Sequence, residues 1–452
     1  MKRLVETGDF MTEQKEKSTS VRWSKTMEKI KGNEMKYFFI ATAVLLYIAA
    51  FLCGSPREIW EGMVGIVRTR DALITDYIAV AGAGACFLNA ALVSTICLTV
   101  TLATKIPFTG PTIAALFINI GYAFWGKNAV NILPVLLGTF LYAKGHHVHF
   151  GRYIYTALFG TCLAPFVTEA VYLLPFSLPV NVVLAVLVGI VIGYLLPPIA
   201  AHTVSMHMGY NLFNVGFAAG VLAFVLFCIL RAFGVESQTV LIWQEGRPLW
   251  LAIVLYGYFA AAFLLGYFLS GRKISKLIAL FRHPGRAVAD FVLMDGPGAT
   301  LMNMGLVGII GLTYILLIGG DLGGPVVGGL LMAFGFAAFG AHGKNYPPVV
   351  LGVLLFSLIS THTPITPGMQ IASLFAVGLA PIAGQFGPVA GVLAGMLHGA
   401  IVMCTSSMYG GLNLYNNGFS AGWVAIFMVP VLESFITRFN NQKARREKKE
   451  KK

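Results

Sequence analysis

The stretch Asn211-Leu-Phe-Asn214-Val-Gly216-Phe-Ala-Ala-Gly220 decides the fold, because it returns near the end of the chain. There it reads Asn413-Leu-Tyr-Asn416-Asn-Gly418-Phe-Ser-Ala-Gly422. Runs of leucine and valine match by chance in any apolar sequence, whereas asparagines and glycines recurring in one order rarely do. The two stretches predict a chain made of two homologous halves.

A second pair of stretches extends this repeat toward the N-terminus. The segment around Asn89, Ala85-Cys-Phe-Leu-Asn89-Ala-Ala-Leu-Val93, matches Ala299-Thr-Leu-Met-Asn303-Met-Gly-Leu-Val307 around Asn303, at an offset of 303 − 89 = 214 positions. The same offset relates further aspartates, glycines and prolines, namely Asp76 to Asp290, Gly110-Pro111 to Gly324-Pro325, Pro134 to Pro348 and Gly138 to Gly352. Later in each half, Leu163-Ala-Pro165 matches Leu379-Ala-Pro381, two positions further on.

The composition places both halves in a membrane. Of the 452 residues, 57% are hydrophobic and 11% are charged, against about 25% charged in soluble domains. A spanning helix needs about 20 mainly apolar residues. We therefore predict an all-α membrane protein with about 14 transmembrane segments, some of them broken or re-entrant. The runs are 37–53, 77–103, 107–125, 130–143, 153–173, 179–197, 212–232, 249–270, 292–317, 325–341, 346–359, 371–384, 388–403 and 416–436. Whether 107–125 and 325–341 cross fully or turn back stays open.

The positions of the basic residues indicate the orientation. The net charge is +13, and much of the excess lies in the two tails and in the linker 272–286. Basic flanks of spans face the cytoplasm, so this charge reflects topology and not nucleic-acid binding. A fourteen-span path puts both termini in the cytoplasm of a multi-pass cell (inner) membrane protein. It gives each half an odd number of spans. The first half therefore begins inside and the second begins outside, so the two halves have opposite orientations in the membrane. The predicted parts are a disordered tail (1–35), a first repeat (36–234), an external loop (235–248), a second repeat (249–437) and a basic tail (438–452).

Paired asparagines are the first candidates for binding a solute. Asn211 and Asn214 lie one helical turn apart, as do Asn413 and Asn416, and Asn417 adds an amide in the second half only. An amide inside a membrane needs a partner. That partner is either a polar solute or a neighbouring helix, and the sequence leaves both alternatives open. Asn89 and Asn303 lie in preceding spans and could line the same cavity.

Two Gly-Pro sequences are the next candidates, Gly110-Pro111-Thr112 and Gly324-Pro325. Proline favours the first turn of a helix. A helix that begins inside the membrane would present free N–H groups to an anion. The alternative is an ordinary helix start at the membrane surface.

Glu169 is the most informative single charge, because it lies within an apolar run. Intramembrane ionisable groups are rare and often functional. Burial favours the protonated carboxyl, which suits proton coupling, and the equivalent residue Gln385 cannot titrate. A surface position for Glu169 is the alternative. His202 and His207 precede the first asparagine pair and are candidates for relaying protons.

Seven plus seven spans, with a third segment that begins at Gly-Pro in each half, resemble the layout of the uracil-permease and sulfate-transporter families. The repeated Asn-Leu-(Phe/Tyr)-Asn-x-Gly-Phe-x-Ala-Gly sequence resembles an uncharacterised bacterial membrane-protein family, a domain of unknown function. Inverted repeats are typical of secondary transporters. The sequence thus predicts a carrier of a small polar or anionic metabolite by alternating access, with proton coupling as a hypothesis.

A passive solute channel and a permease subunit of a multi-component system are the alternatives to a carrier. The chain shows no catalytic motif, no phosphate-binding loop and no convincing metal site, so we expect no enzyme activity, cofactor or metal. The expected partners are the lipid bilayer and a small molecule or ion. Glycines at every fourth position, Gly387 to Gly399, are compatible with close helix packing and with a homo-oligomer.

Overall fold

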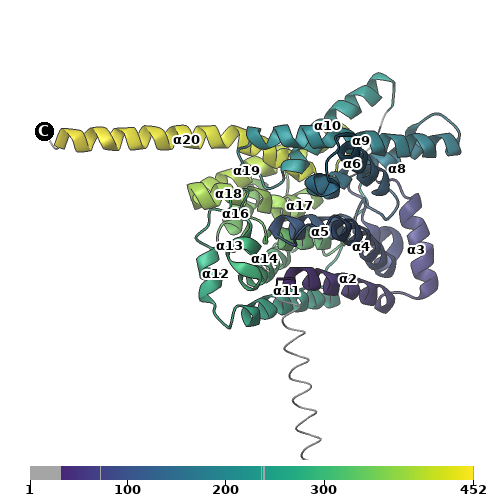
Figure 1. Cartoon of the computed structure of the whole chain (residues 1–452), viewed down its shortest axis with the longest axis horizontal. Helices are drawn as coiled ribbons and strands as arrows, with labels where there is room; N and C mark the ends of the chain where they lie inside the picture. The colour runs from purple at the N-terminus through teal and green to yellow at the C-terminus, as the bar shows by residue number, and fades with distance from the viewer. Residues whose placement is uncertain (1–31, 72, 236, 238–239, 451–452) are drawn as a thin grey trace, which may run out of the picture.

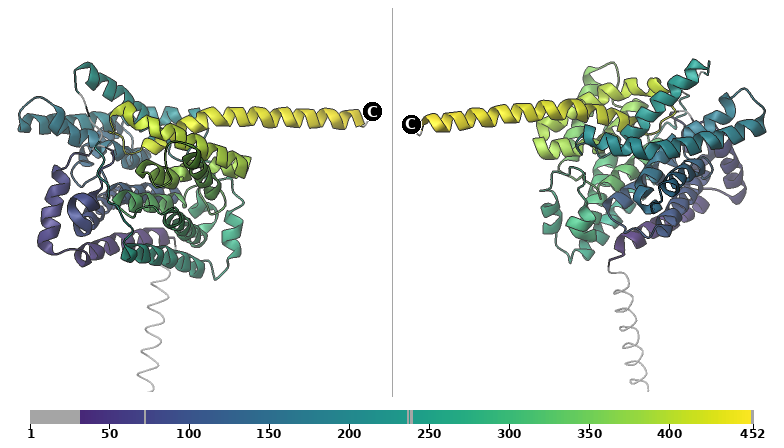
Figure 2. Two further views of the ribbon diagram at one scale, coloured as in Figure 1. Left: turned by 180° about the vertical axis from the view of Figure 1, so that it is seen from behind. Right: turned by 45° about the horizontal axis from the view of Figure 1, so that its top comes forward.

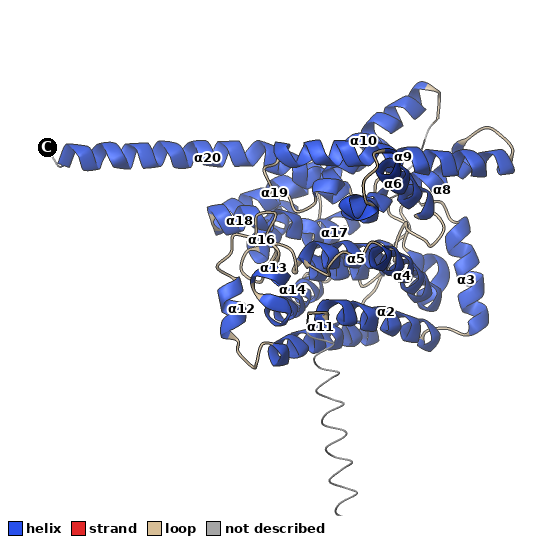
Figure 3. Ribbon diagram, viewed as in Figure 1, coloured by secondary structure: helices blue, strands red, loops and turns tan. Residues whose placement is uncertain are grey.

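The computed structural model describes residues 32–450 except 72, 236, 238 and 239. The described chain is built from helices joined by loops, without a β-strand, as Figure 1 and Figure 3 show. This confirms the predicted all-α membrane fold. Most of the predicted N-terminal tail, residues 1–31, lies outside the described residues.

The first half contains α2 to α10. Their bounds are α2 (Glu34–Leu52), α3 (Pro56–Arg68), α4 (Tyr77–Ala103), α5 (Gly110–Tyr122), α6 (Leu133–Gly145), α7 (Ile154–Gly160), α8 (Ala164–Leu173), α9 (Leu178–Met206) and α10 (Asn214–Ala232). The second half contains α11 (Leu249–Leu269), α12 (Ser275–Leu280), α13 (Phe291–Met294), α14 (Gly296–Leu317), α15 (Gly324–Phe336), α16 (Tyr346–Ile359), α17 (Pro367–Phe375), α18 (Ala380–Phe386), α19 (Pro388–Thr405) and α20 (Asn416–Glu450). Four short 3-10 turns complete the described helices.

Within the described residues, ten helical stretches are long and apolar enough to cross a membrane. Four shorter apolar helices, α5, α6, α15 and α16, account for the remaining predicted runs. Each of the fourteen predicted runs therefore coincides with helix. The number that cross the bilayer completely stays a prediction.

The short helices α5 and α15 form the centre of the molecule. Each has 13 residues, about 20 Å at 1.5 Å per residue, which is less than a hydrocarbon core of about 30 Å. Nearly all of their residues are buried. They cross at Gly121 and Gly328, where a Cβ on either glycine would lie within 2.5 Å of the other's carbonyl oxygen. Only glycine allows the two backbones to approach this closely.

Residues related by the repeat make equivalent contacts. Asn89 Nδ2 donates to the carbonyls of Ala123 and Lys127, at 2.7 Å each. Asn303 Nδ2 donates to the carbonyls of Ala337 and Ala341, at 2.7 and 2.8 Å. Each asparagine thus closes the turn that follows a short central helix, by donating to two backbone carbonyls of that turn.

The amphipathic helix α3 and its counterpart α12 lie at opposite ends of the helix bundle (Figure 1). Helix α3 begins with a capping box at Ser55 and Glu58 and buries only Ile59 and Ile66. Helix α20 continues past the bundle on the same side as α12, and Figure 2 shows this from two further directions.

Candidate functional site

A cavity of about 280 Å³ lies where the two halves meet. The first half contributes the loop before α4 and Trp125, which follows α5. The second half contributes the start of α17, the last turn of α19 and the start of α20. Its lining includes Leu73, Ile74, Trp125, Thr366, Pro367, Val402, Met403, Asn416 and Asn417. A wider depression of about 540 Å³, lined by Trp243, Glu245, Asp321 and Pro367, adjoins it through the shared Pro367.

Two of the predicted substrate-binding asparagines line this cavity. Asn416 Oδ1 accepts hydrogen bonds from Thr405 Oγ1 at 2.6 Å and from the Tyr409 hydroxyl, and Asn416 Nδ2 donates to the carbonyl of Val402. Asn417 Oδ1 lies 3.1 Å from His398 Nε2. The amide of Asn416 is therefore already bonded to the protein, and Asn417 stands beside it at the wall of the cavity.

The first asparagine pair repeats this pattern away from the cavity. Asn214 Oδ1 accepts from Thr203 Oγ1 and lies 2.9 Å from His207 Nε2, and Asn214 Nδ2 donates to Ala200. His207 thus takes the place that Tyr409 has in the second half. Asn214 and Asn416 each join the end of one long helix to the start of the next, which is the packing role of asparagine in membranes.

Asn211 and Asn413 cap their own turns. Asn211 Oδ1 accepts from the Phe213 N–H at 2.9 Å, and Asn413 Oδ1 accepts from the Tyr415 N–H at 3.0 Å. Asn211 Nδ2 also donates to the carbonyl of Gly418 and so links the two halves. His202 is exposed, in contrast to the buried His207.

The starts of the two central helices receive carboxylates from the chain itself. The Gly110 N–H donates to Asp290 Oδ1 at 2.9 Å, and the Gly324 N–H donates to both oxygens of Asp76, at 3.1 and 3.0 Å. In each case the aspartate belongs to the other half. Thr112, next to Pro111, donates to the carbonyl of Pro107 and contacts the Tyr155 hydroxyl. Neither these starts nor Asn89 and Asn303 line the cavity, so in this conformation the anion at each helix start is the protein's own.

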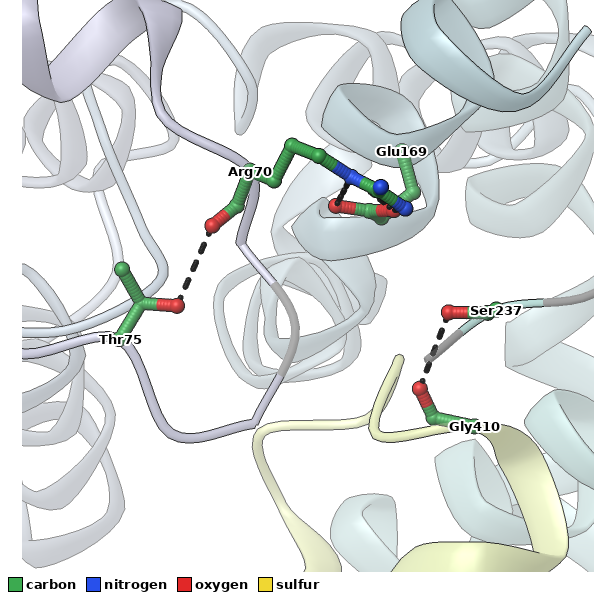
Figure 4. A network of polar contacts seen from close by, with 5 residues as sticks. All are labelled: Arg70, Thr75, Glu169, Ser237 and Gly410. Atoms are coloured by element: carbon green, nitrogen blue, oxygen red, sulfur yellow. Dashed lines mark hydrogen bonds and ion pairs between the residues drawn. The ribbon is translucent and has the colours of Figure 1, made fainter. Parts of the chain in front are cut away.

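Glu169 is buried, with 1% of its surface exposed, and it pairs with Arg70 (Figure 4). Arg70 Nε lies 3.0 Å from Glu169 Oε2, and Arg70 Nη2 lies 2.5 Å from the same oxygen. Figure 4 also shows the Arg70 carbonyl accepting from Thr75, and Ser237 donating to Gly410 nearby. Sequence reasoning missed Arg70, because it stands 99 positions earlier and no local pattern links the two.

Asp71 is a second acidic residue that the sequence analysis passed over. Its carboxylate is fully buried and accepts hydrogen bonds from Tyr77, Asn131 and Thr168, at 2.6, 3.1 and 2.8 Å. Burial raises the pKa of Asp71 to about 7, although these hydrogen bonds act in the opposite direction. Its position between α3 and α4, in a loop, gave no sequence signal of burial.

Lys127 is the third missed residue. It follows Gly126 in the turn after α5 and is completely buried. Its Nζ donates to Asn119 Oδ1 at 3.0 Å and to Thr161 Oγ1 at 2.7 Å, and it lies 4.8 Å from the centre of the Tyr122 ring. The only sequence feature that could have indicated a buried charge here was a single lysine between two apolar runs.

A family model described as "Protein of unknown function (DUF1576)" matches the chain twice, at residues 55–232 and 269–434. These two matches cover most of the chain, so the protein belongs to this family, which confirms the predicted membership of an uncharacterised family. No curated protein and no solved structure matches the chain. The resemblance of its layout to the uracil-permease and sulfate-transporter families stays a prediction.

Proposed function

We propose that this multi-span membrane protein is a secondary active transporter that moves a small polar or anionic metabolite by alternating access. The observation that carries the proposal is the cavity between the two halves, lined by Trp125 from the first half and by Asn416 and Asn417 from the second. Substrate sites of inverted-repeat transporters lie at the repeat interface, next to interrupted helices. Here Trp125, which follows the end of the short helix α5, lines the cavity.

Two further observations support inverted halves. The family model matches each half separately. Helices α3 and α12, which follow the first long helix of their halves, lie at opposite ends of the bundle (Figure 1). With basic residues concentrated in the tails and around α12, we place α12 and both termini on the cytoplasmic side. The cavity then belongs to an outward-facing or partly occluded state.

The test begins with a thermal-shift screen of the purified protein against a metabolite library at two pH values, because a ligand of the folded state raises apparent stability. The best ligand is then used, radiolabelled, in counterflow with proteoliposomes. A carrier takes up labelled solute faster when unlabelled solute is inside the vesicles. The reason is that its binding site turns back to the outside with unlabelled solute bound. Uptake that is indifferent to internal solute would contradict alternating access and indicate a channel.

Variants in the cavity wall sharpen this test. Asn417→Val installs the residue that stands at the equivalent position, Val215, and should weaken apparent substrate affinity about 10-fold, as loss of one hydrogen bond of about 1.4 kcal/mol predicts. The exposed Gln385→Ala serves as the control. Equal apparent substrate affinities in the two variants and in the parent would show that Asn417 does not bind the substrate.

A further inference from the structure

We infer that the Lys127 ammonium group is the counter-ion for a small monocarboxylate that enters from the cavity past Trp125 and Tyr122. The inference rests on the proposed transport function and names the class of its substrate.

Lys127 is a buried cation without an anion. Its neighbours are an amide oxygen of Asn119, a hydroxyl of Thr161 and the ring of Tyr122, all of them neutral. Among the described residues, no carboxylate forms an ion pair with it. An ammonium group removed from water needs a compensating charge, and ionisable groups inside membranes mark solute or proton pathways.

The second half shows that the fold does not need this group. At the positions equivalent to Lys127, Asn119 and Thr161 stand Ala341, Ala333 and Val377. All three are buried, on a backbone that makes the same turn. A polar trio that the counterpart replaces with apolar side chains serves something other than packing.

Three unused hydrogen-bond donors belong to a cluster of rings that Lys127 contacts through Tyr122. Trp125 Nε1 and the hydroxyls of Tyr122 and Tyr415 are buried and have no hydrogen-bond partner among the described residues. The ring of Tyr122 lies 5.3 Å from that of Trp125 and 5.7 Å from that of Tyr415, measured between centroids. An indole N–H only donates, and a hydroxyl can donate. Three free donors in a ring cluster that contacts one cation match a group with one negative charge and several lone pairs.

The surrounding rings restrict the rest of the ligand. Phe375 packs on Tyr122, Trp125 and Tyr415, with centroids 6.0 to 6.5 Å apart. These apolar walls suit a small apolar body attached to a single carboxylate, and they disfavour a second charge. The ligand class is therefore a monocarboxylate and not a di-acid or phosphate.

Access requires a movement of two rings. Trp125 lines the cavity, whereas Lys127 does not. The Tyr122 ring packs on Trp125, which lines the cavity, and on the Lys127 ammonium group, which does not, so a ligand that enters from the cavity would have to pass these rings. Opening this pair of rings would join the cavity to the cation.

The experiment measures thermal unfolding of the purified full chain with acetate, lactate or benzoate, each against its neutral amide, at constant ionic strength. The proteins are the parent, Lys127→Met and Lys144→Met, whose lysine is exposed. Lys127→Met keeps the side-chain length and removes an unpaired charge, so this variant is expected to fold. We expect at least one carboxylate, and no amide, to stabilise the parent and Lys144→Met. Its apparent affinity should fall at least 10-fold in Lys127→Met.

Three results would overturn the inference: no carboxylate stabilises the parent, the amides act equally, or Lys127→Met retains the full shift. The counterflow assay distinguishes failure of the proposed carboxylate site from failure of the proposed transport function. Carboxylate binding that needs Lys127, without counterflow, would keep the site and remove transport. Counterflow of a solute that is unchanged in Lys127→Met would keep transport and remove the site.

Discussion

The turn after α5 and the turn after α15 are built in the same way but differ in their surroundings. In each, an asparagine, Asn131 or Asn345, accepts from the N–H three residues earlier and donates to a glycine carbonyl, that of Gly126 or Gly340. Asn131 also donates to the Asp71 carboxylate at 3.1 Å. At the position equivalent to Asp71 the second half has Gly285.

The same contrast holds for other charged residues of the first half. Where the first half has Arg70, Glu169 and Lys127, the second half has Pro284, Gln385 and Ala341. The shared hydrogen bonds are what the fold requires of both halves. These three charged residues are present in the first half only. The symmetric fold therefore does not require them, and we expect them to have a function beyond packing. Substitutions of shared features should therefore act equally in both halves, and substitutions of the charges should not.

The largest effect is expected where two helix backbones touch. A Cβ on Gly138 would lie 2.1 Å from the carbonyl oxygen of Ile190, and a Cβ on Gly352 would lie 2.1 Å from that of Val392. Gly138→Ala and Gly352→Ala should each lower the free energy of unfolding by about 3 kcal/mol, since backbone has to move. Thermal unfolding of the purified variants measures this loss.

The control is Gly257→Ala in α11, where no atom of the described residues lies within 4 Å of the added Cβ. There alanine should stabilise by about 0.5 to 1 kcal/mol through helix propensity. A clear difference between Gly138→Ala and Gly352→Ala would show that the two halves do not share this contact, and the comparison would fail.

Shared features are also what the sequence predicted best. The repeat, the fourteen apolar runs and the short central segments follow from patterns that a linear scan detects, because glycine, proline and asparagine recur where the backbone demands them. The Arg70–Glu169 pair and the surroundings of Lys127 and Asp71 depend on contacts between distant segments. The sequence therefore singled out Glu169 but neither its partner nor the two other buried charges, and it suggested free helix starts where Asp76 and Asp290 reach across.

The Arg70–Glu169 pair should give an intermediate effect. Glu169 is 1% exposed and Arg70 is 41% exposed, so water screens part of their attraction and the pair is worth less than a fully buried one. A double-mutant cycle with Arg70→Gln and Glu169→Gln should give a coupling energy of about 1 to 2 kcal/mol. The measurement is thermal or denaturant unfolding of the four proteins.

The same variants test the proton-coupling hypothesis. If Glu169 couples transport to protons, Glu169→Gln loses pH-driven uptake in proteoliposomes and keeps counterflow. Identical pH dependence of uptake in Glu169→Gln and the parent would leave the pair as a structural contact. Gln385→Glu, which places a carboxyl at the exposed equivalent position, should change neither property.

The smallest effect is a pH dependence of stability that belongs to the first half alone. Burial raises the pKa of Asp71 to about 7 from its usual 3.8, so the folded protein holds a proton that the unfolded chain has already released. Stability from this proton is fully present below pH 4 and is lost as the pH rises through about 7. Between pH 6 and 8 the parent should lose about 1 kcal/mol, since one pKa unit corresponds to about 1.4 kcal/mol. Asp71→Asn should remove this slope, whereas Asn345→Ser, which adds no ionisable group at the position equivalent to its partner Asn131, should not affect it. A slope that persists in Asp71→Asn would assign the titration to another group and leave Asp71 ionised by its three hydrogen bonds.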